Sequence, residues 1–327
     1  MIITRTPFRI SFLGGGTDYP TWCDSNSGAV LSTTIDKYCW ITCRRLPPFF
    51  EHKTRVTYSF IERVNSIDEI QHPSVRECLR FLSIEEGVEI HNDGDLPART
   101  GLGSSSAFTV GLLLALRCLQ GKMVPKDQLA RDAIHVEQRM IMENVGAQDQ
   151  VAAAFGGLNF IEFGKNGTFR VQPVPLPSDR LKRLQDCLML FYTGVSRFAS
   201  EVAGEQIKNI PNKTEELLTM RTMVDKATSI LSGNSDLSDF GRLLNESWLI
   251  KKRLSTRVSS QIIDQIYETA MNSGALGGKL LGAGGGGFML LFVEPEKQAK
   301  VRERLREYLY VPFAFETLGS QVIFYQT

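Results

Sequence analysis

The spacing of apolar residues changes along the chain, and each spacing predicts a different element. Residues 126–142 place apolar side chains at three- and four-residue steps, which is typical of an amphipathic helix. Residues 105–119 are almost uniformly apolar, so we expect a buried helix there. Residues 9–12 alternate polar and apolar side chains, as a half-buried strand does. The chain therefore combines helices with strands.

Other segments extend this pattern. Runs rich in β-branched and aromatic residues predict strands at residues 28–44, 55–60, 187–193, 288–293 and 321–325. Helical patterns predict helices at residues 149–155, 215–231, 237–254, 262–271 and 296–308. We expect a hairpin between residues 158–163 and 168–174, because Asn166-Gly167 supplies the positive φ angles of a tight turn.

A proline-rich stretch at residues 173–179 divides the chain into two halves. We predict two domains on this basis, residues 1–176 and residues 177–327. Strands mixed with paired helices in both halves indicate an α+β fold built in layers.

Composition narrows the classes of protein that fit. The 327 residues include 37 basic and 36 acidic side chains, for a formal net charge of +1. This balance gives no broad attraction to nucleic acid or to an anionic membrane, so we expect neither as a partner. The longest apolar run, near residues 110–116, is well short of the ~20 residues that cross a bilayer. The amino terminus lacks the features of a secretory signal, and we expect a cytoplasmic protein.

Glycines cluster at residues 14–16, 101–103 and 274–287, where the backbone must turn tightly or approach something closely. In residues 96–107, glycines lead into three serines and then into the apolar helix. The free N–H groups at a helix start, together with the helix dipole, attract anions such as phosphate. An ordinary serine-capped helix fits the same residues, so the segment by itself leaves both interpretations open.

Two common nucleotide-binding motifs fit the chain poorly. Residues 273–280 come nearest to a P-loop but lack its first glycine and its final hydroxyl. Gly101, Gly103 and Ala107 satisfy a relaxed dinucleotide fingerprint, but the preceding residues 93–97 make a poor parallel strand. This partial match keeps an NAD-dependent oxidoreductase as one alternative.

Two carboxylates favour phosphoryl transfer. Glu137 lies on the amphipathic helix, and Asp149 follows Gly146, where the chain can reverse and bring both acids to one metal–phosphate site. Arg9 completes the set, because a guanidinium beside Asp149 favours the ionised carboxylate and stabilises charge on a transferring phosphoryl group. Each residue also has a structural interpretation: Glu137 as a solvated helix residue, Asp149 as a helix N-cap and Arg9 as a salt-bridge residue.

Three separated motifs together resemble the GHMP kinase family. Residues 6–19, TPFRISFLGGGTDY, are similar to the opening motif of its sugar kinases. Residues 97–106 are similar to the phosphate loop of the family, and residues 279–288, KLLGAGGGGF, to its carboxyl-terminal glycine motif. The resemblance implies an α+β fold of two domains with the active site in the cleft between them. It also implies ATP and Mg²⁺ as cofactors.

The resemblance further implies roles for individual residues. Asp149 would be the catalytic carboxylate, supported by Arg9, and Mg²⁺ would be held by Ser105 and Glu137. The ATP phosphates would be wrapped by Gly101, Leu102, Gly103, Ser104, Ser105 and Ser106. The acceptor would be held by Asp18, Gly15, Gly16, Thr17, Gly285, Gly286 and Arg197.

The opening motif, residues 48–53 and residues 192–197 are together most similar to the heptose 7-phosphate kinases of the family, which phosphorylate an anomeric hydroxyl. Galactokinases carry a Glu-His pair where this chain has Gly15-Gly16. A phosphorylated sugar needs cations distal to the ATP. Candidates by charge are Lys53, Arg55, Arg99 and Arg197, each of which also fits a solvated surface position.

Further alternatives stay open beside this resemblance. The acceptor can be another sugar, such as fucose or galactose. From a different class, the chain can be a catalytically silent sensor of sugar and ATP. The sequence also leaves open whether the protein forms a homodimer.

Overall fold

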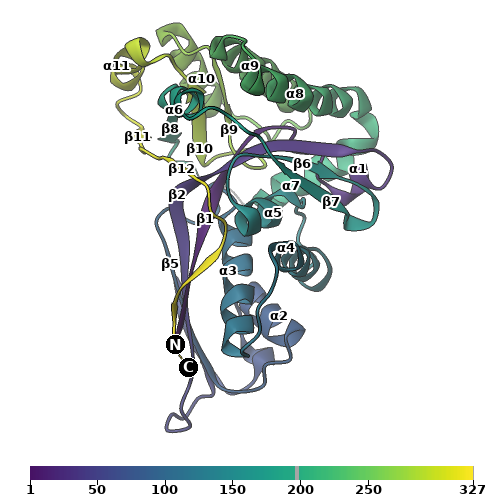
Figure 1. The fold of residues 1–327 in the computed structure, drawn as a ribbon, viewed down its shortest axis with the longest axis vertical. Helices are drawn as coiled ribbons and strands as arrows, with labels where there is room; N and C mark the ends of the chain where they lie inside the picture. Colours follow the sequence, from purple (N-terminus) through teal and green to yellow (C-terminus); the bar gives the residue numbers. More distant parts are fainter. Residues whose placement is uncertain (196–198, 327) are drawn as a thin grey trace.

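The computed structural model describes residues 1–195 and 199–326, and within these ranges the chain forms two β-sheets with helices packed on them (Figure 1). The larger sheet contains, in spatial order, β13 (Gln321–Tyr325), β1 (Ile2–Leu13), β2 (Gly28–Arg45), β5 (Val88–Gly94), β3 (Thr54–Thr57) and β4 (Ile61–Val64). Three further strands extend it: β6 (Asn159–Phe163) and β12 (Phe315–Glu316) pair with β2, and β7 (Phe169–Pro173) pairs with β6.

The smaller sheet is antiparallel and lies at the other end of the molecule (Figure 1). Its order is β11 (Leu309–Tyr310), β8 (Leu188–Tyr192), β10 (Phe288–Phe292) and β9 (Gly277–Leu280). In the larger sheet, among the described strands, only the β3–β5 pair is parallel. A Rossmann arrangement, which the dinucleotide interpretation requires, is therefore absent from the described part of the chain.

The helices fall into two groups, one in each half of the chain. Associated with the larger sheet are α1 (Pro20–Cys23), α2 (Pro73–Phe81), α3 (Ser104–Leu119), α4 (Lys126–His135) and α5 (Gln148–Phe155). The second half contributes α6 (Ser178–Asp186), α7 (Ala199–Asn209), α8 (Thr214–Ser232), α9 (Leu237–Lys252), α10 (Gln261–Ser273) and α11 (Pro295–Arg304). Short 3₁₀ turns occupy Ile67–Glu69, Lys165–Gly167 and Ile210–Asn212, and a π turn at Val136–Met140 follows α4. No helix in the described ranges is long and apolar enough to cross a membrane.

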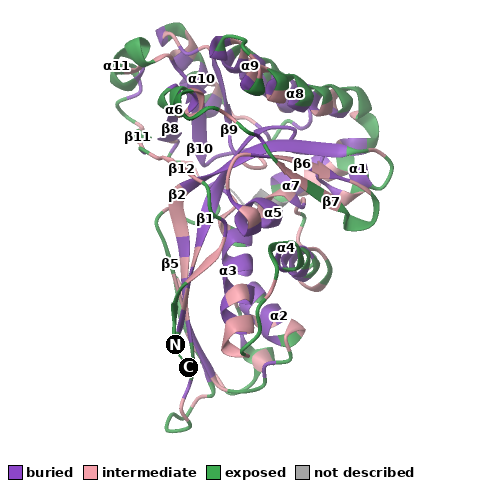
Figure 2. Cartoon of the chain, in the orientation of Figure 1, coloured by how far each residue is buried: buried purple, intermediate pink, exposed green. Residues whose placement is uncertain are grey.

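The uniformly apolar helix α3 is the centre of the larger layer. It packs on β1 and β2 on one side and contacts α2, α4 and α5 on the other, so it is covered nearly all round. Figure 2 shows it as largely buried. This surrounding explains why its sequence lacks the polar stripe of an ordinary surface helix.

Strand β1 becomes fully buried along its second half. Every residue from Thr6 to Leu13 is buried, because α3, α5, α8 and α9 also contact this strand. The polar members of the alternating pattern, Arg9 and Ser11, are therefore buried too. Buried polar side chains are uncommon without a partner or a function, and these two lead to the site described below.

Several predicted elements are confirmed, and some boundaries differ. The α+β class is correct, and the β6–β7 hairpin turns at Asn166-Gly167 with positive φ angles, as predicted. The predicted helix over residues 126–142 changes to a π turn after His135. The predicted helix over residues 296–308 ends at Arg304, because the chain returns as β11. The strand β5 and the helix α2 were not expected.

The end of the chain returns to the larger sheet. β12 pairs with β2, and β13 pairs with β1 so that Ile2 lies opposite Tyr325. The termini are consequently neighbours (Figure 1). One hydrophobic core runs from Ile2 to Val311 and includes residues of both sheets, while a second core lies between the smaller sheet, α10 and α11. The division after residue 176 remains a prediction.

Candidate active site

A cavity of about 960 Å³ opens where the second half of β1, the start of α3 and the start of α5 come together. α7, α9 and the end of β9 contribute further residues to its wall. Residues predicted from the sequence that line the cavity are Arg9, Gly15, Gly16, Asp18, Arg99, Gly101, Gly103, Ser104, Ser105, Ser106 and Asp149. Segments from both halves of the chain therefore meet at one site.

Arg9 and Asp149 form a two-point ion pair inside this cavity. The Arg9 Nε and Nη2 atoms each donate to a carboxylate oxygen of Asp149 at 2.8 Å. The Arg9 Nη1 atom donates to the Gly101 carbonyl at 2.6 Å, and the backbone N–H of Arg9 donates to the Leu102 carbonyl at 3.0 Å. Arg9 is 4% exposed at its side chain and Asp149 is 26% exposed. The arginine is thus part of the wall, while the carboxylate stays accessible from the cavity.

Asp18 lies next to this pair and is almost completely buried. Its Oδ1 accepts from the Gly16 N–H at 2.9 Å and its Oδ2 accepts from the Gln148 N–H at 3.2 Å. Burial raises the pKa of Asp18, and the nearby negative charge of Asp149 acts in the same direction. Gly146 makes the approach possible, since a Cβ atom there would lie 1.8 Å from Asp18 Oδ2.

The two glycine motifs touch through their backbones at the start of α3. A Cβ atom on Gly101 would lie 2.4 Å from the Leu281 carbonyl oxygen, and one on Gly282 would lie 2.5 Å from Gly101 Cα. The first N–H groups of α3 have no partner within the helix, and the helix begins at the wall of the cavity. The arrangement provides donors and a positive helix end for an anionic group.

Glu137 is completely buried behind Ser106, in the π turn after α4. Its Oε2 accepts from the Ser106 hydroxyl at 2.8 Å and from the Gln150 amide at 2.5 Å. Its Oε1 has no partner within hydrogen-bond distance. Burial raises the pKa of Glu137 to about 7, although the Thr109 side chain lies close enough to lower it. A buried carboxylate with one unpartnered oxygen fits the donor set that a hard divalent cation prefers.

The hydroxyl group that donates to Glu137 belongs to Ser106 and not to Ser105. Ser105 is exposed and lines the same cavity. Because successive helix residues point about 100° apart, these two serines face different directions from the first turn of α3.

Two buried lysines also line the cavity, and the sequence analysis assigned no role to either. Lys251, on α9, donates to the Gly282 carbonyl, and Lys279, on β9, donates to the Phe12 carbonyl at 2.9 Å. Burial lowers the pKa of Lys251 to about 8 and lowers that of Lys279 well below its usual range. The positive charge of Arg9 acts in the same direction on both. The basic side chains of Arg9, Lys251 and Lys279 therefore all lie in the wall of the cavity that holds Asp149.

The remaining predicted residues support the loops or lie elsewhere. Thr17 donates to the Gly14 carbonyl at 2.8 Å and is fully buried, and Leu102 is also buried. The Gly285 N–H donates to the Val258 carbonyl at 3.0 Å, and a Cβ atom on Gly286 would lie 2.4 Å from the Val195 carbonyl oxygen. Arg197 lies outside the described residues.

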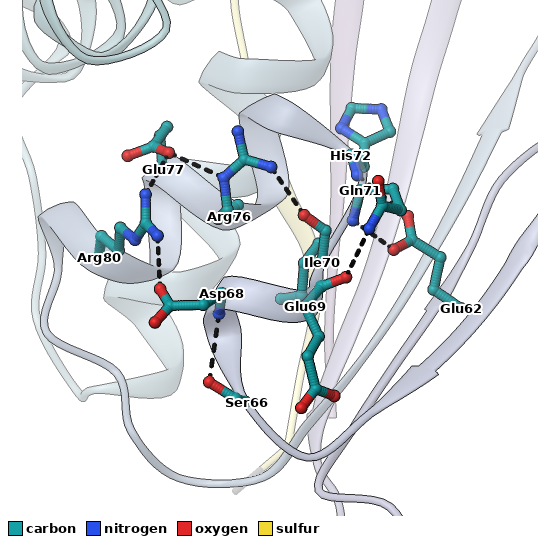
Figure 3. A network of polar contacts seen from close by, with 10 residues as sticks. All are labelled: Glu62, Ser66, Asp68, Glu69, Ile70, Gln71, His72, Arg76, Glu77 and Arg80. Carbon is teal, nitrogen blue, oxygen red and sulfur yellow. Dashed lines mark hydrogen bonds and ion pairs between the residues drawn. The ribbon is translucent and has the colours of Figure 1, made fainter.

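The far wall of the cavity carries flat rings. The His72 ring lies 4.8 Å from that of Tyr58 and 4.7 Å from that of Phe108, measured between centroids. Glu62 holds the segment before α2 in place, because its Oε1 accepts from the His72 N–H at 3.0 Å. Figure 3 shows this contact beside the Arg76–Glu77–Arg80 ion pairs on α2. The network positions the imidazole at the cavity wall.

The chain matches the models of two domains of one protein family. Residues 72–157 match the GHMP kinases N terminal domain, and residues 228–311 match the GHMP kinases C terminal domain. The chain is 30% identical over 317 residues to a D-glycero-alpha-D-manno-heptose 7-phosphate kinase of Campylobacter jejuni, covering 94% of this chain and 93% of that protein. It is 26% identical to a galactokinase of Pyrococcus furiosus, with 94% of each chain covered.

The fold has a close counterpart among solved structures. A crystal structure of a D-glycero-D-manno-heptose 1-phosphate kinase from Bacteriodes thetaiotaomicron superposes with a TM-score of 0.82, covering 100% of both chains at 22% identity. Fold and site together define a kinase that phosphorylates an alcohol group of a small molecule. The chain belongs to the GHMP kinase family.

Proposed function

We propose that the chain transfers the γ-phosphoryl group of ATP to the anomeric hydroxyl of a sugar phosphate. The acceptor we favour is D-glycero-D-manno-heptose 7-phosphate, which would give the 1,7-bisphosphate. The observation that carries the proposal is the Arg9–Asp149 pair beside the glycine loop in one cavity. The similarity to the C. jejuni relative supports the choice of a heptose phosphate.

ATP would lie along the start of α3. Gly101, Leu102 and Gly103 with Ser104, Ser105 and Ser106 would surround its phosphates, and the rings of Tyr58, His72 and Phe108 offer apolar contacts to its base. Glu137 would hold Mg²⁺, and its unpartnered Oε1 supports this role. The Ser106 hydroxyl, which contacts Glu137, is better placed to be the second ligand than the predicted Ser105, which faces another direction. Bound there, the cation would neutralise charge on the phosphates.

Asp149 would accept the proton of the acceptor hydroxyl. Arg9 orients its carboxylate through two hydrogen bonds, which fixes the direction from which the hydroxyl must approach. An anomeric hydroxyl is more acidic than other sugar hydroxyls, so a weak base suffices. Lys251 would add positive charge beside the transferring group.

The acceptor would contact the opening glycine motif. Asp18 would bind sugar hydroxyls, while Gly15, Gly16 and Thr17 would shape the pocket around them. Gly285 and Gly286 would approach from the second half of the chain, and the predicted role of Arg197 remains a prediction. A homodimer and a cytoplasmic location remain predictions.

An ADP-coupled assay with ATP and Mg²⁺ tests the proposal across four acceptors: heptose 7-phosphate, mannose, fucose and galactose. We expect the highest kcat/KM for heptose 7-phosphate. A higher value for galactose or fucose would identify the chain as a kinase of that free sugar, which the galactokinase relative makes the second candidate. A sugar-dependent thermal shift without ADP release would instead support the silent sensor.

A further inference from the structure

Three consecutive glycines follow β1, but the backbone requires glycine at only two of these positions. Gly14 has φ +82°, and a Cβ atom on it would lie 1.9 Å from the Ala29 carbonyl oxygen. Gly16 has φ +110°, a conformation that L side chains rarely adopt. Gly15 has no positive φ, and a Cβ atom there would meet its nearest neighbours at ordinary contact distances of 3.4–3.8 Å. The backbone therefore does not require glycine at position 15.

Two polar side chains border the space that Gly15 leaves open. The position of a Gly15 Cβ atom lies 3.4 Å from Ser11 Oγ and 3.4 Å from Gln148 Nε2, with Gln148 Oε1 at 3.8 Å. Ser11 is 4% exposed, and neither its Oγ nor Gln148 Oε1 has a hydrogen-bond partner. Both residues line the cavity, together with Gly15.

An unpartnered buried polar atom destabilises a protein, so a pair of them beside the same gap in a cavity indicates a missing partner. Both groups are neutral, and one hydroxyl group satisfies them together. It donates its proton to Gln148 Oε1 and accepts the proton of the Ser11 hydroxyl. A phosphate suits this place less well, because two neutral side chains offer it no charge.

We propose that Ser11 and Gln148 recognise a single hydroxyl of the acceptor in the gap beside Gly15, and so determine which sugars bind. This inference rests on the proposed function, since it assigns the acceptor to this end of the cavity. The hydroxyl differs from the one that is phosphorylated, but it is close to it. Ser11 is two residues beyond Arg9 on β1, and Gln148 directly precedes Asp149.

The chain contains a matched control for Ser11. Ser32 lies directly opposite Ser11 in the β1–β2 register, is 1% exposed, and also has an unpartnered Oγ. Among the described residues, the cavity wall includes Ser11 but not Ser32. The substitutions Ser11→Ala and Ser32→Ala therefore remove the same chemical group at equal burial, inside and outside the cavity.

The test measures binding of heptose 7-phosphate by calorimetry without nucleotide, and KM for sugar and for ATP by the ADP assay. We expect Ser11→Ala to weaken sugar binding about tenfold with KM for ATP unchanged, and Ser32→Ala to match the wild type. One monodeoxy analogue of the sugar should bind the wild type about tenfold more weakly and be unaffected by Ser11→Ala. Gly15→Val should weaken sugar binding without lowering the melting temperature.

Equal sugar affinity of Ser11→Ala and wild type would overturn the inference. An equal effect of both serine substitutions would also overturn it, because the two hydroxyls would then be hydrogen-bonded to each other across the two strands. Sugar binding by the wild type without turnover would reject the proposed function, while the serine comparison would still decide the inference. Failure of the wild type to bind heptose 7-phosphate, mannose, fucose and galactose would overturn both.

Discussion

Arg9 holds both carboxylate oxygens of Asp149 at 2.8 Å, although one residue lies on β1 and the other in the first turn of α5. The guanidinium is buried and also anchored to the Gly101 carbonyl at 2.6 Å, so it cannot turn away from the carboxylate without losing a third contact. Bidentate arginine–carboxylate pairs fix direction as well as distance. The pair therefore connects the opening motif, the glycine loop and α5 in one rigid unit.

Replacing Asp149 with Asn should lower kcat by about 10²- to 10⁴-fold, the range for loss of a general base. The amide keeps the shape of the side chain, so ATP affinity should stay near that of the wild type. Steady-state kinetics and a nucleotide titration check this. Asp132→Asn is the control, because Asp132 is a buried carboxylate paired with Arg117 that is not among the described cavity residues. Near-normal turnover of Asp149→Asn would remove Asp149 from the mechanism.

Glu137→Gln should raise the Mg²⁺ concentration needed for half-maximal activity by at least tenfold, since the variant lacks the anionic oxygen proposed as a ligand. A magnesium titration at saturating ATP measures it. Glu77→Gln serves for comparison, because Glu77 is buried against Arg76 and Arg80, and its substitution should leave the titration unchanged. Identical titrations for wild type and Glu137→Gln would argue against ligation at Glu137.

The pKa of Glu137, raised by burial to about 7, also predicts how stability depends on pH without metal. Between about pH 4.5 and pH 7 the unfolded chain has released this proton while the folded chain retains it. The unfolded state then binds fewer protons, so the contribution of Glu137 to the free energy of unfolding falls as pH rises through this window and is constant above it. Urea unfolding of wild type and Glu137→Gln should diverge there, and parallel curves would contradict the prediction.

The pKa of Lys251, lowered by burial to about 8, predicts an alkaline loss of turnover. The ammonium gives up its proton as pH rises from 7 to 9, so the positive charge proposed beside the transferring group is lost over this range. The kcat with heptose 7-phosphate should fall several-fold across this range in the wild type and stay flat in Lys251→Met. Lys252→Met, which removes the neighbouring lysine paired with Asp264, should behave as the wild type does. A wild-type profile without this fall would exclude Lys251 as the source of charge.

Gly146→Ala should destabilise the protein by about 1–3 kcal/mol, the usual range for overpacking. Its methyl group would lie 1.8 Å from Asp18 Oδ2 and push Asp18 away from the Gly16 and Gln148 N–H groups. Gly15→Ala makes a suitable comparison, because the added methyl meets ordinary contact distances, and its stability should be close to that of the wild type. Chemical denaturation of both variants decides the matter, and equal stabilities would show that Asp18 moves without penalty.

Much of the site could be predicted from sequence because its residues lie in glycine-rich motifs. Arg9, Asp18 and Asp149 are close to glycines that constrain the backbone, and the structure places them around one cavity. Ser106 was not singled out as the partner of Glu137, since the rotation of α3 about its axis depends on packing against β1 and β2 rather than on local sequence.

The buried lysines show what local patterns miss. Lys251 precedes Lys252 at the end of an amphipathic helix, and the two look alike in sequence, although only Lys251 is buried. The difference arises because the carboxyl-terminal glycine motif lies against that face of α9, where Lys251 donates to the Gly282 carbonyl. Likewise β5 is short and only partly apolar, and it owes its form to pairing with β2. Long-range contacts of this kind leave no periodic trace in the sequence. The helix α2 differs and could have been recognised, because buried residues lie there at helical spacing, namely Val75, Cys78 and Leu79.

The pairing of β13 with β1 has a consequence for synthesis of the protein. The first residues of β1, Ile2–Arg5, are hydrogen-bonded on one edge by β2 and on the other by β13, which is translated about 320 positions later. A nascent chain must therefore keep this edge free of other partners until β13 has been made. The strand that carries Arg9 would accordingly gain its second neighbour only at that late point.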